Sequence, residues 1–328
     1  MDEKLRIVVS GGGTGGHIFP AVSIANAIKA KHPDAEILFV GALGRMEMER
    51  VPQAGYEIVG LPVRGLIRPL WSPKNVGVLI DFLRSKHKVR KVLKDFRPMA
   101  AVGVGGYASA ATLNAAHAMG VPCLIQEQNS YAGVTNKVLA SGADKICVAY
   151  DGMERFFPAD KIIKTGNPVR QSLIESTISV EDARKSFGLD PEKKTVVFVG
   201  GSLGARTVNE SILRHLDLVE QAKDIQFIWQ TGKYYNASIN KEIEGKKPGN
   251  LLVTDFISDM GAAYKAADLV ISRAGASSIS EFCLIGKPVV LVPSPNVAED
   301  HQTKNAMALV NKDAAIYVKD ADAPETLL

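Results

Sequence analysis

Short apolar runs alternate with helical patterns along the 328 residues of the chain. The first run is followed by a helical pattern that ends near residue 30, and a second helical pattern covers residues 44–54. The runs predicted as strands are residues 5–9, 37–41, 58–62, 100–104, 121–125, 146–150, a run from 162 onward, 195–199, 226–230, 251–253, 269–271 and 288–293. Buried strands separated by helices are typical of a parallel sheet with helices on both faces. The predicted fold class is therefore α/β.

The first strand runs into a glycine-rich segment, residues 10–16, and then into a helix. Glycine permits positive φ and close approach of a ligand, and the N–H groups at a helix N-terminus favour anions. The segment therefore predicts an anion site with His17 as a titratable ring at its mouth, and Pro20 is expected in the first helical turn. A tight strand-to-helix turn is the alternative, but five glycines exceed what a turn requires.

The same order of elements restarts at residue 195, where a strand leads into the glycine loop 200–204 and a helix. We therefore predict two Rossmann-like domains facing a cleft, residues 1–166 and 167–328, with the Gly-Asn-Pro turn at 166–168 as the linker. Polar residues 126–130 end one strand, at the edge of the sheet where ligands bind.

The composition is that of an ordinary globular protein, with 46% hydrophobic and 23% charged residues. A net charge of +4 does not indicate nucleic acid as a partner. The three cysteines have no C-x-x-C spacing, so we expect buried thiols in a reducing compartment and neither a disulfide nor a zinc site. A signal peptide and a membrane-spanning run are not expected.

Residues 64–97 differ from the remainder because ten cations are interleaved with apolar residues, against only Asp81 and Asp95. One interpretation is a solvated helix whose apolar stripe packs on the sheet. The other is a basic amphipathic segment, with an apolar loop at 66–71, that sits on an anionic bilayer surface. Composition alone leaves both open.

Dinucleotide binding is disfavoured although Gly11, Gly13 and Gly16 satisfy G-x-G-x-x-G, because the second strand ends without the acid that binds ribose. A carboxylate can accept two ribose hydroxyls, and Glu281 lies about one turn into a helix of the second half. The hydroxyls of Ser277 and Ser278 could hold a diphosphate there without metal. The Asp320-x-Asp322 pair lacks a glycine loop and is not expected to bind metal.

Eight motifs, in this order, closely resemble those of the MurG family: GGGTGGHIFPA, GVGGYAS, QEQNSYAG, TGNPVR, GGSLGAR, DFISDM, SRAGASSISE and HQTKNA. These are UDP-N-acetylglucosamine–N-acetylmuramyl-(pentapeptide) pyrophosphoryl-undecaprenol N-acetylglucosamine transferases. The resemblance implies an inverting GT-B glycosyltransferase that converts lipid I to lipid II at the cytoplasmic face of the cell membrane. The N-terminal domain would take the lipid acceptor and the C-terminal domain the UDP-sugar. Family members continue into a C-terminal helix, which is expected to be missing here because the sequence stops at Leu328.

The resemblance also implies site residues, and it favours peripheral membrane contact by residues 64–97. No cofactor and no metal are implied. The donor contacts carried over are Thr14, Gly15, Gly16, Asn129, Arg170, Ser202, the backbone of Ile257 at the uracil, Ala276, Ser277, Ser278, Ile279, Ser280 and Glu281 at the diphosphate and ribose, and Gln302 at the sugar.

For catalysis we expect a base that takes the proton of the acceptor's C4 hydroxyl. His17 is the first choice because an imidazole suits neutral pH, and Glu127 is the second. Binding of a phosphate oxygen is the alternative role of His17. Two other functions remain open: a UDP-N-acetylglucosamine 2-epimerase, which needs no lipid acceptor, and a non-catalytic UDP-sugar-binding protein at the membrane.

Overall fold

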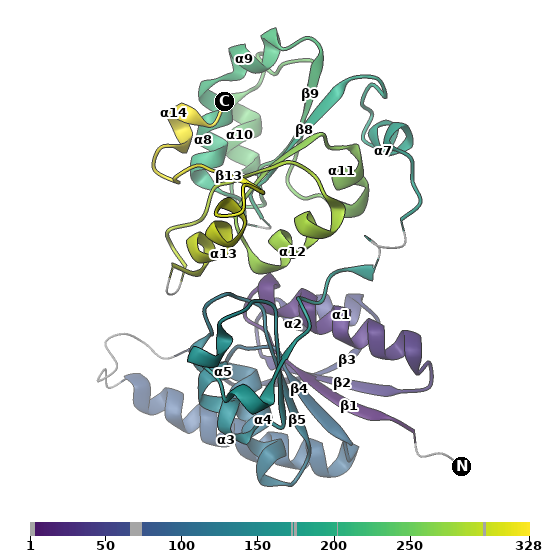
Figure 1. Ribbon diagram of the computed structural model, residues 1–328, viewed down its shortest axis with the longest axis vertical. Coiled ribbons are helices and arrows are strands. Elements are labelled where there is room, and N and C mark those ends of the chain that lie inside the picture. Colours follow the sequence, from purple (N-terminus) through teal and green to yellow (C-terminus); the bar gives the residue numbers. More distant parts are fainter. Residues whose placement is uncertain (1–3, 66–73, 172, 174–175, 202, 298–299) are drawn as a thin grey trace. The chain divides into compact units, whose positions relative to one another are not determined.

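The structure is a computed structural model that describes residues 4–65, 74–171, 173, 176–201, 203–297 and 300–328. The chain divides into two compact units, Met1–Gln171 and Ser172–Leu328. Each unit is a parallel sheet with helices on both faces (Figure 1), so the α/β prediction is confirmed. The loop predicted at residues 66–71 lies outside the described residues.

The sheet of the first unit has the strand order β3-β2-β1-β4-β5-β6-β7, and all its described pairings are parallel. Its strands are β1 (Arg6–Ser10), β2 (Glu36–Ala42), β3 (Glu57–Leu61), β4 (Ala100–Gly103), β5 (Cys123–Glu127), β6 (Lys145–Val148) and β7 (Ile162–Lys164). Its helices are α1 (Gly15–Lys31), α2 (Glu47–Gln53), α3 (Lys74–Phe96), α4 (Tyr107–Ala118), α5 (Val134–Leu139) and the 3₁₀ turns η1 (Ala140–Gly142), η2 (Met153–Arg155) and η3 (Ala159–Lys161).

Alternate side chains of β1 enter two different cores because successive strand residues point to opposite faces. Ile7 and Val9 pack with Ile18 and Ala21 of α1 on one face. Val8 packs on the other face, with the helices α3, α4 and α5. Both faces of the strand are therefore buried, which explains its continuous apolar sequence.

The second unit repeats this plan with the strand order β10-β9-β8-β11-β12-β13. Its strands are β8 (Lys194–Val199), β9 (Ile225–Gln230), β10 (Leu251–Thr254), β11 (Leu269–Ser272), β12 (Val289–Leu291) and β13 (Ile316–Tyr317). Its helices are α7 (Val180–Ser186), α8 (Arg206–Arg214), α9 (Leu216–Gln221), α10 (Asn236–Glu242), α11 (Met260–Ala266), α12 (Ala276–Ile285), α13 (His301–Val310) and α14 (Ala323–Thr326).

Each sheet reverses its order at one point, between β1 and β4 in the first unit and between β8 and β11 in the second. Ligands of open α/β sheets bind in the crevice beyond the carboxyl ends of the strands at such a point. The glycine-rich segments 11–16 and 104–106 follow β1 and β4, and the segments 200–204 and 273–275 follow β8 and β11. The topology thus brings the predicted loops together in pairs within each unit.

Two expectations are corrected. Pro20 is not in the first turn of α1, because the helix begins at Gly15. Since proline has no N–H, the helical hydrogen bond from residue 20 to the Gly16 carbonyl is absent. Cys283 is exposed on α12, whereas Cys123 is buried. In the Gly-Asn-Pro turn, which stays a prediction as the linker, the Asn167 amide donates to the Gln128 carbonyl oxygen at 2.9 Å.

Helix α3 has two different halves. Its C-terminal half packs on the sheet through Val89 and Leu93, both essentially buried. Its N-terminal half exposes Val76, Leu79, Ile80 and Leu83. That spacing of i, i+3, i+4 and i+7 places the four side chains on one helix face. The helix therefore has an apolar stripe that the described part of the chain leaves open to solvent.

Candidate active site

The loop between β1 and α1 is shaped by packing as well as by conformation. Gly13 has φ +87°, in the region that favours glycine. A Cβ on Gly12 would lie 2.0 Å from Oε1 of Glu47, which is 0% exposed. A Cβ on Gly16, by contrast, would meet only the Thr14 hydroxyl, at 3.6 Å. Conformation therefore explains Gly13 and packing explains Gly12, but neither explains Gly16, which leaves room for a ligand at the start of α1.

His17 lies between the two glycine loops of the first unit. Its Nδ1 is 3.0 Å from the carbonyl oxygen of Gly12. Because a carbonyl only accepts, Nδ1 carries the proton in this hydrogen bond, and Nε2 is the basic nitrogen of the neutral ring. A Cβ on Gly105, which has φ +104°, would lie 2.9 Å from Nε2. The second glycine loop therefore makes room for the ring.

Thr14 and Arg170 border the same loop. Thr14 is exposed at the N-cap of α1, and its carbonyl accepts from the backbone of His17 and Ile18 at 3.1 and 3.2 Å. The Arg170 guanidinium lies 4.8 Å from the centre of the Phe19 ring in the next turn of α1. The structure thus brings a cation predicted from sequence to the predicted anion site.

Glu127 is buried, and both of its carboxylate oxygens accept hydrogen bonds. Oε1 accepts from the backbone and side-chain amides of Asn129 at 3.0 and 3.2 Å. Oε2 accepts from the Gly133 backbone at 3.0 Å and from the Asn136 amide at 2.8 Å. This carboxylate therefore fixes the loop that follows β5, including the predicted donor contact Asn129.

That loop is also connected to the glycine loop of β4. The Gln128 amide donates to the Val104 carbonyl oxygen at 3.0 Å, and it also donates to the side chain of Gln126. Gln126, Glu127 and Gln128 are each at most 2% exposed. The polar residues that end β5 therefore form an internal network that positions the loop, rather than a row of side chains open to a ligand.

In the second unit the glycine loop after β8 closes against the end of β9. A Cβ on Gly204 would lie 2.2 Å from the Thr231 carbonyl oxygen, and one on Gly232 would lie 2.1 Å from the Gly204 nitrogen. Both glycines have positive φ. Ser202, predicted as a donor contact, lies outside the described residues.

Helix α12 presents the predicted diphosphate and ribose contacts. Ser277 Oγ is buried and has no hydrogen-bond partner among the described residues. Ser280 donates to the Ala276 carbonyl oxygen at 3.1 Å. Glu281 is 3% exposed and accepts from the Tyr264 hydroxyl at 3.1 Å. The helix start therefore holds a buried hydroxyl one turn from a buried carboxylate.

The three other residues predicted as contacts on α12 are Ala276, Ser278 and Ile279. Ala276 and Ile279 are buried, and Ser278 is half-buried. Ile257, in the loop after β10, is buried in the core that also contains Ile279. The Gln302 side-chain oxygen accepts from the Ser294 backbone at 2.8 Å. Because the Ile257 side chain faces the core, a ligand at this loop would meet its backbone.

Sequence reasoning missed Arg273, which precedes α12. Its guanidinium pairs with the Asp320 carboxylate and donates to the Val292 carbonyl oxygen at 3.0 Å. The Thr207 hydroxyl donates to the same carboxylate at 2.6 Å. Asp320 therefore anchors the start of α12. Within the described ranges, no three His, Cys, Asp or Glu side chains gather as a metal site.

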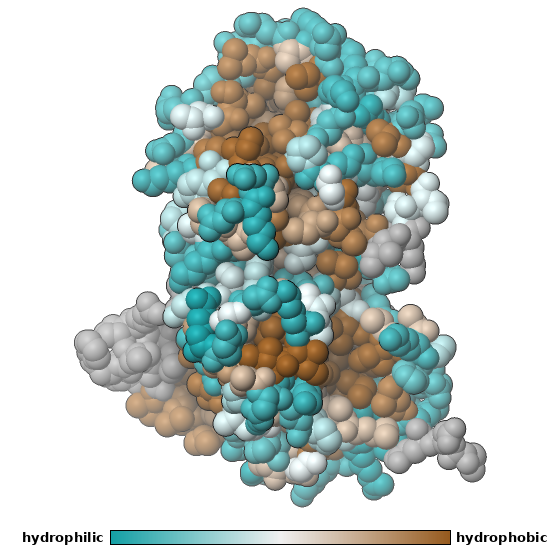
Figure 2. All heavy atoms as spheres, in the orientation of Figure 1, coloured by the Kyte–Doolittle hydropathy of each residue, from teal (hydrophilic) through white to brown (hydrophobic). Residues whose placement is uncertain are grey.

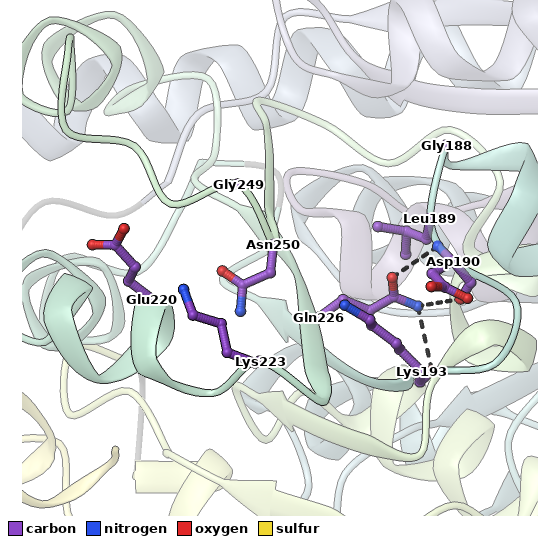
Figure 3. A pocket seen from close by; sticks show the side chains of 9 residues that line it. All are labelled: Gly188, Leu189, Asp190, Lys193, Glu220, Lys223, Gln226, Gly249 and Asn250. Carbon is purple, nitrogen blue, oxygen red and sulfur yellow. Dashed lines mark hydrogen bonds between the residues drawn. The ribbon is translucent and has the colours of Figure 1, made fainter.

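Two cavities in the described part of the chain lie at the opposite, amino ends of the strands. One of about 330 Å³ is shown in Figure 3 and lies where β8, β9 and β10 begin. Its two lysines, Lys193 and Lys223, are balanced by Asp190 and Glu220, so charge does not favour an anion. The other, of about 340 Å³, lies beside α4 and includes Cys123, whose pKa burial raises to about 11. Neither reaches the glycine loops.

Comparison with known families matches both halves of the chain. The model of the glycosyltransferase family 28 N-terminal domain matches residues 7–148, and that of the C-terminal domain matches residues 195–328. The crystal structure of Acinetobacter baumannii MurG is similar, with a TM-score of 0.73 at 29% identity, covering 98% of this chain and 88% of that one. UDP-GlcNAc 2-epimerase from Neisseria meningitidis, bound to UDP-GlcNAc, shares the fold with a TM-score of 0.66 at 14% identity, over 99% and 90% of the two chains.

The fold and both family matches define a two-domain glycosyltransferase of family 28 with GT-B architecture. Relatives from Bacteroides fragilis and Phocaeicola vulgatus are both named "UDP-N-acetylglucosamine--N-acetylmuramyl-(pentapeptide) pyrophosphoryl-undecaprenol N-acetylglucosamine transferase". They are 67% and 68% identical to the chain, over 99% and 100% of it and over 86% and 87% of their own lengths. The chain belongs to this family, the MurG family, which confirms the resemblance read from its motifs.

Proposed function

We propose that the chain transfers N-acetylglucosamine from UDP-N-acetylglucosamine to the C4 hydroxyl of the N-acetylmuramyl group of lipid I, giving lipid II for peptidoglycan. The observation that carries this proposal is the 67% identity, over 99% of the chain, to an enzyme named for that transfer. The first unit takes the lipid acceptor, and the second takes the UDP-sugar.

The proposed reaction is a direct displacement with His17 as the base. Nε2 of the neutral ring accepts the proton of the C4 hydroxyl as its oxygen attacks the anomeric carbon. The bond from that carbon to the diphosphate oxygen breaks, the electron pair leaves with UDP, and attack from the opposite face gives a β-linkage. The Nδ1–H···O hydrogen bond to Gly12 supports this role because it leaves Nε2 as the basic nitrogen.

The proposed donor site uses Ser277 and Glu281, which lie one turn apart at the start of α12. The buried Ser277 hydroxyl and the helix N-terminus hold the diphosphate and stabilise the negative charge that develops on it. Glu281 accepts the ribose hydroxyls, the Ile257 backbone meets the uracil, and Gln302 meets the sugar. No metal is needed in this scheme, so we expect full activity in EDTA.

The remaining proposed contacts lie in the first unit and in the loop after β8. Thr14, Gly15 and Gly16 at the start of α1, with Arg170 beside them, contact the donor together with Asn129. Ser202 is proposed from its motif alone. Because both Glu127 oxygens accept amide hydrogen bonds, we assign Glu127 to hold the Asn129 loop rather than to remove the acceptor proton.

We also propose that the chain is a peripheral protein of the cytoplasmic membrane face, attached through residues 64–97. Among the described residues, no helix has the length and apolar character for crossing a bilayer. The exposed stripe of α3 supports surface attachment, and Figure 2 shows apolar surface on this helix. Asp81, on the same helix, is paired with Arg64 at 2.7 Å, so the negative charge of Asp81 is balanced and opposes anionic lipid less.

One assay separates this proposal from its two alternatives. Radiolabelled UDP-N-acetylglucosamine is incubated with the protein, with and without a lipid I analogue, and with EDTA in parallel. Label transferred to the lipid supports the proposal, and EDTA should not reduce it. Epimerised sugar without lipid would instead identify an epimerase, and binding without turnover a UDP-sugar sensor.

A further inference from the structure

The buried carboxylate of Glu47 is not used by the mechanism above. Glu47 begins α2, and its side chain is 0% exposed. Its Oε1 accepts from the Ala42 backbone N–H at 2.9 Å, and its Oε2 accepts from the Gly13 backbone N–H at 3.0 Å. A buried carboxylate thus joins the end of β2 to the glycine loop that follows the neighbouring strand β1.

The N–H of Gly13 and the carbonyl of Gly12 belong to one peptide group. Glu47 accepts from the nitrogen side of this group, and the His17 Nδ1–H donates to its oxygen side at 3.0 Å. Because the peptide group is planar, fixing the N–H also fixes the direction of the carbonyl. Gly12 cannot carry a side chain here, since a Cβ would lie 2.0 Å from the Glu47 carboxylate.

We propose that Glu47 is a positioning residue that acts on His17 through the Gly12–Gly13 peptide group. The carboxylate holds and polarises this group, so that the carbonyl oxygen becomes a stronger acceptor for Nδ1–H. The hydrogen bond selects the Nδ1–H tautomer and leaves the lone pair on Nε2. The inference deepens the proposed function and rests on His17 as its base. In other histidine sites a carboxylate bonds the ring directly and selects its tautomer. Here Glu47 has the same role, with one peptide group between the carboxylate and the ring.

A purely structural role predicts a different outcome. In that case Glu47 would only satisfy two buried N–H groups, and its loss would weaken the fold or substrate binding whatever residue stands at position 17. A positioning role makes its effect on turnover depend on His17. The two roles therefore differ in the coupling between the two positions and in the tautomer of the ring.

The first test is a double-mutant cycle between Glu47→Gln and His17→Ala. Glutamine keeps the shape and one acceptor oxygen but removes the charge. We expect Glu47→Gln alone to lower kcat about 10- to 100-fold with UDP affinity unchanged, and to have no further effect in the His17→Ala background. The matched control is Glu49→Gln on the exposed side of the same helix, which should change neither quantity.

The second test reads the ring directly by ¹⁵N NMR, with the His17 signals assigned from their loss in His17→Ala. At a pH where the ring is neutral, we expect the Nδ1–H tautomer in the wild-type protein and a mixture of tautomers in Glu47→Gln. Should Glu47→Gln fail to fold, the wild-type spectrum still decides, because a dominant Nε2–H tautomer overturns the inference.

The outcomes separate this inference from the proposed function. Equal losses of kcat from Glu47→Gln in both backgrounds would overturn the positioning role and leave His17 as the base. Full turnover in His17→Ala would instead remove the base and with it the role of Glu47 in turnover. An absence of transfer to lipid would reject the proposed function, while the tautomer in Glu47→Gln would still test the link between the two side chains.

Discussion

Replacing Leu79 and Leu83 on α3 with serine should detach the protein from anionic membranes. Full burial of a leucine side chain contributes about 2 kcal/mol, and these two are 59% and 57% exposed. Each therefore contributes about 1 kcal/mol to insertion in proportion to its exposed fraction. The double variant should partition about 30-fold more weakly, because about 1.4 kcal/mol corresponds to a factor of 10.

The assay is co-sedimentation with vesicles that contain phosphatidylglycerol, at two salt concentrations. Serine leaves the charge unchanged, so the salt dependence that the cations produce should persist while the affinity falls. The matched control is Leu218→Ser, a leucine that is 45% exposed on α9 of the second unit, which should bind as the wild type does. Equal binding of the double variant and the wild type would refute the docking role of the stripe.

Glu281→Gln should weaken UDP binding about 10- to 100-fold, as expected for loss of hydrogen bonds to a charged group; calorimetry measures this, and unchanged affinity would reject the ribose contact. Burial raises the pKa of Cys123 to about 11, so this thiol should resist iodoacetamide at pH 8 in the folded protein and react in urea. Mass spectrometry of the peptide that contains Cys123 measures the labelling, and rapid labelling of the folded protein would contradict the prediction. Burial raises the pKa of Asp268, but hydrogen bonds from Thr195 and Lys194 and the charge of Arg184 outweigh it and lower the pKa below its usual value. Asp268→Asn should therefore cost about 1–2 kcal/mol at neutral pH and progressively less as the pH falls below about 4, which urea unfolding at several pH values can check.

The sheets could be predicted from sequence because buried parallel strands need apolar residues on both faces. The helix at 44–54 was also predicted, and α2 covers Glu47–Gln53. The short strand β13 was not predicted, since its two residues, Ile316 and Tyr317, are both exposed. The position of β13 depends on its pairing with β12, and a pattern of apolar residues cannot predict this pairing.

The role of Glu47 could not be read from sequence because it depends on a turn in space. The second strand ends at Ala42 without an acid, and on that ground dinucleotide binding was disfavoured. In the structure, an acid a few residues later turns back to the strand end and bonds backbone N–H groups. The sequence does show glycines at positions 12 and 41, near the ends of two apolar runs. Only the packed structure shows that the Glu47 side chain occupies the space where a Cβ of either glycine would lie.

Glu127 shows a second limit of sequence-based prediction: a residue predicted at a ligand site can have a structural role. A polar run at a strand's carboxyl end indicates a ligand site, and the sequence cannot tell whether such side chains face a ligand or one another. Here they bond one another. Glycine positions were more informative, because the ring of His17 requires the space beside Gly105.

The central claim is that His17, on the first glycine loop, removes the proton from the acceptor hydroxyl. Its most direct test is turnover of His17→Ala with a lipid I analogue, together with UDP affinity by calorimetry. A positioned base contributes about 10²- to 10⁴-fold, so kcat should fall by that factor while UDP affinity stays within about twofold. Wild-type turnover, or a loss of UDP affinity that accounts for the whole change, would contradict the account.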